Sequence, residues 1–167
     1  RGVVQRVSPR LASAGEAQPD GSLLYRDAFG PGIDVLYRCN ALKTEEFLVI
    51  GGADIPVGDT GTGVSPLPSV RTFSWQLELG KNAQRLKPRL TPMHTIELCD
   101  EKGVPRLRID LPEGKDANGA RLSAGKELCY TLEDDHLTLR ADLSTAKFPV
   151  IIDPSWSSTG AFISGGR

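Results

Sequence analysis

The sequence lacks a long apolar run, an excess of charge of either sign, and any stretch with helical hydrophobic spacing. No apolar run approaches the roughly 20 residues that a membrane-spanning helix needs, so we expect no membrane insertion. Lysine and arginine number 20 and aspartate and glutamate 21, a balance that gives no electrostatic basis for binding nucleic acid. No segment repeats apolar residues at i, i+3, i+4 and i+7, which argues against amphipathic helices.

Sequence patterns that carry chemistry are also scarce. The chain has no Gly-x-Ser-x-Gly motif, no phosphate-binding loop and no Cys-x-x-Cys pair, and its two histidines, His94 and His136, are isolated. The three cysteines cannot all pair within one chain. Either all are free thiols, or one disulfide forms, most readily Cys99–Cys129, and Cys39 stays free; a zinc site is the remaining alternative. We therefore expect no catalytic residues, no metal site and no cofactor.

The chain does contain many short segments in which apolar and polar residues alternate. Within 70–79, for example, Phe73, Trp75 and Leu77 share one face and polar residues share the other. Its 18 glycines and 12 prolines fall in almost every gap between such segments. This pattern predicts an all-β fold, an antiparallel β-sandwich of about ten strands. The clearest predicted strands are 22–25, 33–39, 44–50, 70–79, 95–99, 106–111, 127–132, 137–143 and 148–152.

The length of 167 residues fits one domain with a substantial core. Residues 1–21 are small and polar and are predicted to form an N-terminal arm, and residues 22–154 the β-sandwich. Residues 155–167 are interpreted as a linker or as the first strand of a following repeat region, and the Gly-Gly-Arg end suggests a piece of a longer protein. Two loops are predicted, Gly51–Ser69 and Gly114–Gly125.

Two aspartates stand beside sharp bends. Asp34 follows the turn that contains Gly32, and Asp153 precedes Pro154. A short acidic side chain at such a place accepts backbone N–H bonds and stabilises the bend, so we interpret these four residues as structural turn residues. Two alternatives stay open: the carboxylates form an acid/base pair, or they bind a hard cation.

The aromatic residues Trp156 and Phe162 lie in the uncharged C-terminal segment. We interpret them as interaction residues that contact a neighbouring domain or subunit. The alternative is a platform on which a sugar ring stacks.

Two longer motifs stand near the ends of the predicted sandwich: Tyr25-x-Asp27-x-Phe29-Gly-Pro-Gly-Ile-Asp34-x-x-Tyr37 and Phe148-Pro-Val-Ile-Ile-Asp153-Pro154. Together they resemble the β-rich N-terminal domain that precedes β-propeller or other repeats of the SBBP type in large bacterial secreted or surface proteins. The resemblance implies a bacterial protein that is secreted or located at the cell surface. It implies no activity.

From these observations we expect a non-catalytic structural or interaction module, not an enzyme, whose partners are neighbouring protein domains or subunits of a larger assembly. A carbohydrate-binding module, with Trp156 contacting a glycan, is the second hypothesis. A metal-assisted hydrolase that uses Asp34 and Asp153 is the third.

Overall fold

A computed structural model of the chain describes residues 5–7, 14–39, 43–51, 70–77 and 86–158. Every regular element in these residues is a β-strand, and two sheets contain all of them. The fifteen strands are β1 (Gln5–Val7), β2 (Glu16–Ala17), β3 (Leu23–Tyr25), β4 (Ile33–Cys39), β5 (Lys43–Ile50), β6 (Val70–Gln76), β7 (Lys87–Leu90), β8 (Ile96–Cys99), β9 (Pro105–Ile109), β10 (Glu113–Lys115), β11 (Arg121–Leu122), β12 (Leu128–Glu133), β13 (His136–Asp142), β14 (Val150–Asp153) and β15 (Trp156–Ser158).

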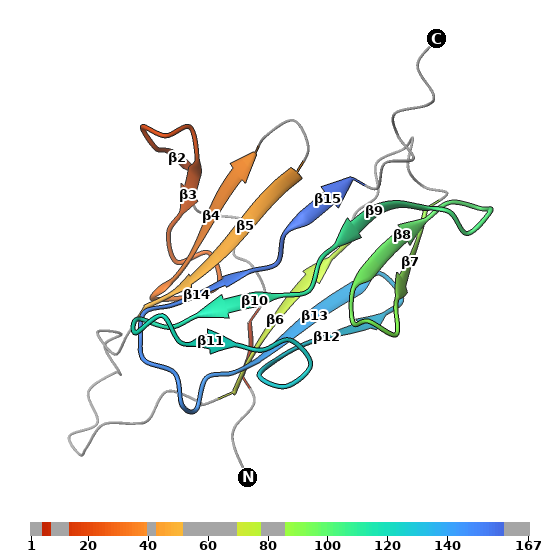
Figure 1. The fold of residues 1–167 in the computed structure, drawn as a ribbon. Helices are drawn as coiled ribbons and strands as arrows, with labels where there is room; N and C mark the ends of the chain where they lie inside the picture. The colour runs from red at the N-terminus through yellow and green to blue at the C-terminus, as the bar shows by residue number, and fades with distance from the viewer. Residues whose placement is uncertain (1–4, 8–13, 40–42, 52–69, 78–85, 159–167) are drawn as a thin grey trace.

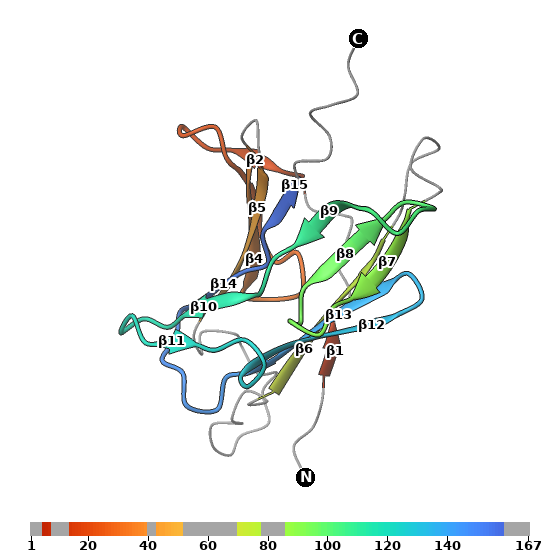
Figure 2. The same ribbon diagram turned by 45° about the vertical axis from the view of Figure 1, so that its right-hand side comes forward.

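The smaller sheet has the strand order β1-β6-β13-β12 (Figures 1 and 2). Strands β6, β13 and β12 pair antiparallel, and β1 adds a parallel edge strand beside β6. Leu137 lies opposite Trp75 and Leu139 opposite Phe73, and these side chains and Leu77 belong to the core or pack against it. Because side chains alternate along a strand, the apolar face predicted from Phe73 and Trp75 is the inner face of this sheet, and residues 78 and 79 of the predicted strand lie outside the described residues.

The larger sheet is organised around β5. Its path runs β11-β10-β14-β5-β15-β9-β8-β7, and β4, β3 and β2 extend from the other edge of β5. Both β14 and β15 pair with β5, and Pro154, which has no N–H to donate, lies between them. Pro112 separates β9 from β10 in the same way. At these breaks the backbone N–H of Asp110 donates to the carbonyl of Ser155 at 3.0 Å, so the sheet continues across both prolines.

The two sheets face each other and enclose one hydrophobic core (Figure 2). Leu48, Ile50 and Val150 from the larger sheet and Phe73 and Leu139 from the smaller one are fully buried. Each such side chain contributes about 1.5–3 kcal/mol by leaving water. At one side β7 lies beside β12 of the smaller sheet. The predicted class, an all-β antiparallel sandwich, is confirmed.

The prediction of a continuous loop over Gly114–Gly125 is wrong, because this range contains the end of β10 and all of β11. Gly114 is a buried strand residue: a Cβ built there would lie 3.1 Å from the Leu122 Cβ and 3.2 Å from the Leu128 Cδ1. The glycine therefore allows β10 to approach its neighbours closely, and its presence does not indicate a loop.

The ends of the described chain also take part in the sheets. Residues 5–7 and 16–17, within the predicted arm 1–21, form β1 and β2. Residues 156–158, within the predicted linker or first repeat strand 155–167, form β15 between β5 and β9. The predicted loop Gly51–Ser69, apart from Gly51, lies outside the described residues. There are more strands than predicted because the additional ones, β1, β2, β7, β10, β11 and β15, have only two to four residues, and segments this short show no readable alternation.

Candidate functional site

A cleft of about 500 Å³ lies between the two sheets. Strands β4, β5, β8, β9 and β15 of the larger sheet contribute to it, together with β6 and the residue after β6 from the smaller sheet. Its volume falls within the range of about 300–1,000 Å³ that is usual for ligand sites. Six of the nine lining residues are aromatic or leucine; the nine are Tyr37, Thr44, Glu46, Trp75, Gln76, Leu77, Leu98, Leu107 and Trp156.

Glu46 supplies the carboxyl group of this cleft. The alternation of β5 places it on the inner face together with Leu48 and Ile50, and only 4% of the residue is exposed. The indole N–H of Trp75 donates to its Oε1 at 3.1 Å, and the hydroxyl of Tyr37 is a second hydrogen-bond partner. Burial raises the pKa of Glu46 from 4.5 to about 7, although both hydrogen bonds act in the opposite direction.

The two partners of Glu46 are held by aromatic packing. The ring of Phe29 contacts Trp75 edge-on, with centroids 5.5 Å apart, and also contacts Phe73 at 5.5 Å. The ring of Tyr25 contacts Tyr37 edge-on at 5.8 Å. Such edge-to-face pairs have preferred orientations, so they restrict both hydrogen-bond donors. Burial is also the first cause of the raised pKa of the Tyr37 hydroxyl, which therefore stays protonated at neutral pH.

Trp156, one of the two predicted interaction residues, lies in this cleft. It begins β15, where it is opposite Thr44 of β5 on one side and Ile109 of β9 on the other. Its side chain is half-buried and packs against the hydrophobic core. Phe162, the other predicted interaction residue, lies outside the described residues.

The carboxylates of the hydrolase hypothesis are not brought together. Asp34 lies on β4 opposite Val49 of β5, and Asp153 lies on β14, on the far side of β5. Two strands that flank a third are about 10 Å apart across the sheet. The two carboxylates are therefore too far apart to form an acid/base pair.

Both aspartates form hydrogen bonds with residues of the bends beside them. Asp34 accepts the backbone N–H of Asp27 at 2.9 Å, and Asp27 in turn accepts the backbone N–H of Gly32 at 2.6 Å. Gly32 has φ of 72°, a left-handed conformation that favours glycine. Asp153 accepts a hydrogen bond from the hydroxyl of Ser155, and the residue between them, Pro154, is buried. Partial burial of the Asp153 carboxyl group raises its pKa.

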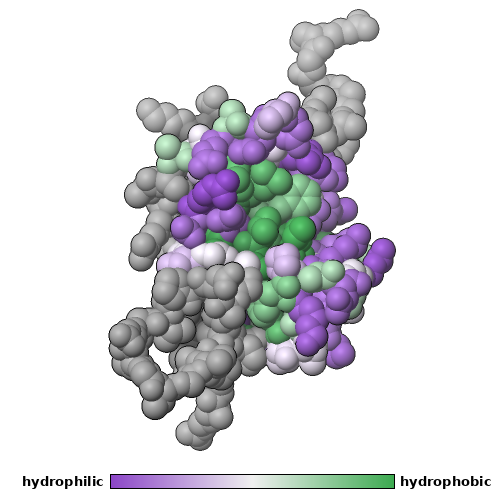
Figure 3. Space-filling view, turned by 90° about the vertical axis from the view of Figure 1, so that its left-hand side faces the viewer, coloured by the Kyte–Doolittle hydropathy of each residue, from purple (hydrophilic) through white to green (hydrophobic). Residues whose placement is uncertain are grey.

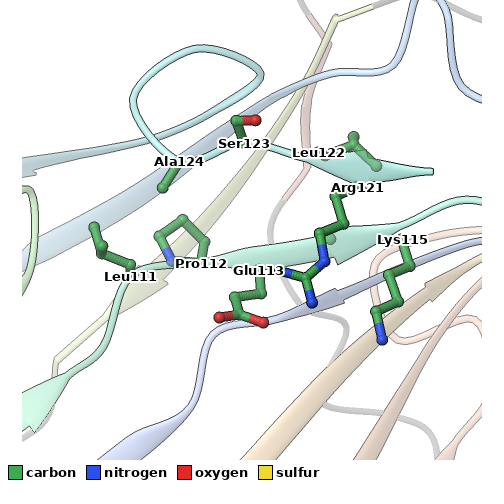
Figure 4. A pocket seen from close by; sticks show the side chains of 9 residues that line it. Leu111, Pro112, Glu113, Lys115, Arg121, Leu122, Ser123 and Ala124 are labelled. Atoms are coloured by element: carbon green, nitrogen blue, oxygen red, sulfur yellow. The ribbon is translucent and has the colours of Figure 1, made fainter. Parts of the chain in front are cut away.

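A second, smaller depression of about 200 Å³ lies along β10 and β11. Figure 4 shows the side chains of Glu113, Lys115 and Arg121 projecting to the same side of these strands. Lys115 lies directly opposite Arg121 in the antiparallel pair. These charged side chains border the outer face of the larger sheet, where Phe47 and Ile151 line a further shallow depression. Figure 3 shows an apolar area bordered by hydrophilic side chains on the side of the molecule where β3, β4 and β14 lie.

No disulfide joins the cysteines: Cys39 is exposed, Cys129 is partly buried and Cys99 is buried, and all three are free. The alternative of a Cys99–Cys129 disulfide is therefore not realised. In the part of the chain that the structure describes, no group of three or more His, Cys, Asp or Glu side chains is arranged to hold a metal ion.

Glu46 was not among the predicted site residues, although the sequence contains a signal for it. In the predicted strand 44–50 this glutamate has the same parity as Leu48 and Ile50, so it occupies a core position. Acidic residues are rarely buried without partners. A charged residue in phase with an apolar face therefore indicates either a buried polar network or a site.

Comparisons of the chain with protein-family models, with curated proteins and with solved structures found no match. Across the described ranges, no helix is long and apolar enough to cross a membrane.

Proposed function

We propose that this chain is a non-catalytic interaction module and that a protein partner inserts side chains into the cleft lined by Trp156. One observation supports this most: aromatic and leucine side chains from both sheets line a single cleft beside a buried carboxyl group. Tryptophan and tyrosine are enriched at the centres of protein interfaces, where they form pockets for an anchoring side chain. Thr44, Glu46 and Gln76 are the polar lining residues, and such groups orient a ligand.

A phage-displayed library of random peptides tests this proposal. We expect the full chain to enrich peptides that share an apolar residue, and the enriched peptides to quench tryptophan fluorescence on binding. Trp156→Ala removes one wall of the cleft and is expected to weaken these peptides more than tenfold. Ile151→Ser is the matched control, because Ile151 is 45% exposed and does not line the cleft. A thermal melt followed by circular dichroism checks that both variants fold.

Peptides that bind Trp156→Ala as well as the unchanged chain would show that the cleft is not the docking site. Failure of the unchanged chain to enrich any common sequence would count against protein docking altogether.

A carbohydrate-binding module is the second candidate, because Trp156, Trp75 and Tyr37 line the same cleft as a carboxyl group, and aromatic faces together with a carboxylate are a common sugar-binding combination. The leucines favour a protein side chain over a sugar, since a sugar also needs many polar partners. A glycan array decides between them: binding that is lost in Trp156→Ala would support this candidate.

We also propose that the module belongs to a secreted or cell-surface bacterial protein and precedes a repeat region. The motifs around Asp34 and Asp153 support this proposal through their resemblance to such domains. The sequence of the full-length precursor tests it, by the presence or absence of an export signal and of repeats after residue 167.

A further inference from the structure

The carboxyl group of Glu46 has hydrogen-bond partners but, among the described residues, no cation beside it. Its pKa is set by burial, by Trp75 and by Tyr37, and no lysine, arginine or histidine of the described residues contributes to it. An ionised carboxylate accepts about four hydrogen bonds, and the two donors leave part of this capacity unused. A buried carboxylate without a cation is costly, so an incoming cation would gain energy by pairing with it.

The walls of the cleft also suit a cation. Tyr37, Trp75 and Trp156 line it together with Glu46. The faces of aromatic rings attract cations, tryptophan most strongly, and this attraction increases when water is excluded. Two independent features of the cleft, its carboxyl group and its aromatic lining, therefore favour the same kind of ligand.

We infer that the cleft takes the ammonium group of a lysine side chain of the partner, bound to Glu46 and surrounded by Tyr37, Trp75 and Trp156. This inference rests on the proposed function and adds the chemistry of the docking side chain. The four methylene groups of lysine pack along Leu98 and Leu107, and the charged end reaches the carboxylate.

An ammonium group that carries N–H bonds fits Glu46 better than the alternatives. A quaternary ammonium has no N–H to donate to the carboxylate. A guanidinium group binds a carboxylate best with two parallel bonds, one to each oxygen, and the hydrogen bonds from Trp75 and Tyr37 leave fewer acceptor positions for such a pair. A primary ammonium is a compact charge that needs a single free acceptor position.

This binding mode requires the ionised form of Glu46, so it depends on pH. Besides Trp75 of β6, the described residues that interact with Glu46 are Tyr37 of β4 and, electrostatically, Tyr130 of β12, and burial raises the pKa of both hydroxyls, so neither titrates near neutral pH. With the pKa of Glu46 at about 7, roughly a tenth of the molecules carry the charge at pH 6 and nearly all at pH 8. Binding should therefore weaken about tenfold between pH 8 and pH 6.

The experiment titrates the full chain with n-butylammonium, which reproduces the end of a lysine side chain, and follows the indole N–H signal of Trp75 by NMR. Butan-1-ol is the neutral control, and tetramethylammonium and n-butylguanidinium are the alternative cations. We expect a saturable shift of the Trp75 signal with n-butylammonium, about tenfold weaker at pH 6 than at pH 8, and little effect of butan-1-ol. Glu46→Gln should abolish both the shift and its pH dependence.

Glu45→Gln is the matched control variant, because Glu45 is the next residue on β5, pairs with Lys43 at 2.6 Å and does not line the cleft. Equal binding of butan-1-ol, unchanged binding by Glu46→Gln, or tighter binding of either alternative cation would overturn the inference. Peptides that need Trp156 but bind Glu46→Gln at full strength would overturn the lysine assignment and leave the proposed docking intact. Peptides that do not need Trp156 would overturn the docking itself.

Discussion

Substitution of Glu46 by glutamine removes an ionisable group from the inner face of the larger sheet and keeps the size of the side chain. Glutamine can accept the indole N–H of Trp75 through its oxygen and donate to the Tyr37 hydroxyl through its nitrogen. The main change is therefore that position 46 no longer gains or loses a proton with pH. Glu46→Gln thus separates the effect of the charge from the effect of packing.

The magnitude follows from the difference between the folded and unfolded pKa values. Burial raises the pKa of Glu46 from 4.5 to about 7, and each pKa unit is worth about 1.4 kcal/mol, so the full effect is about 3 kcal/mol. The folded state holds the proton more tightly than the unfolded state. The contribution of protonated Glu46 is therefore complete below pH 4.5 and is lost as the pH rises to about 7.

The assay is urea unfolding of the unchanged chain and of Glu46→Gln at several values between pH 4.5 and pH 8. Relative to the unchanged chain, we expect the variant to gain about 3 kcal/mol of unfolding free energy across this range. Carboxyl groups elsewhere, Asp153 included, titrate in both proteins and cancel in the comparison. A difference between the two proteins that stays constant with pH would refute the reasoning, and Glu45→Gln should show such a constant difference.

Two further substitutions test the fold. Leu48→Ala empties a fully buried position of β5 and should cost about 2–5 kcal/mol in urea unfolding; a loss below 1 kcal/mol would mean that the inner face of β5 is not in the core. Asp34→Ala leaves the backbone N–H of Asp27 without its acceptor and should lower the unfolding free energy by about 1 kcal/mol, while Asp34→Asn, which keeps an acceptor oxygen, should recover part of this loss. Equal stabilities of these last two variants would indicate that the bend does not depend on that hydrogen bond.

The alternation of apolar and polar residues was sufficient to predict most of the longer strands. Phe73 and Trp75, which were predicted to share the buried face, both lie on the core side of β6. The alternation did not predict the structure where close packing determined which residue could occupy a strand. Gly114 reads as a loop residue in the sequence, but in β10 it is the residue whose missing side chain lets Leu122 pack closely.

For the candidate site, the sequence pointed to Trp156 but not to its neighbours. An uncharged segment with an isolated tryptophan indicates an interaction residue whatever the fold. Glu46 and Trp75 are 29 positions apart in the chain, and only the packing of one sheet on the other places the indole N–H 3.1 Å from the carboxylate. The distance between Asp34 and Asp153 was equally beyond prediction, because it depends on β5 lying between their strands.

The sequence by itself determined the class of this protein: its period-two alternation and the glycines and prolines in its gaps allow strands and turns and exclude amphipathic helices. These are local properties, set by side chains that are neighbours in the chain. Which strands pair, and which side chains meet across the core, depends on contacts between distant segments, so only the tertiary structure decided them. The cleft around Glu46, with residues from β4, β5, β6 and β15, is the clearest case, because it places a buried carboxyl group beside Tyr37, Trp75 and Trp156.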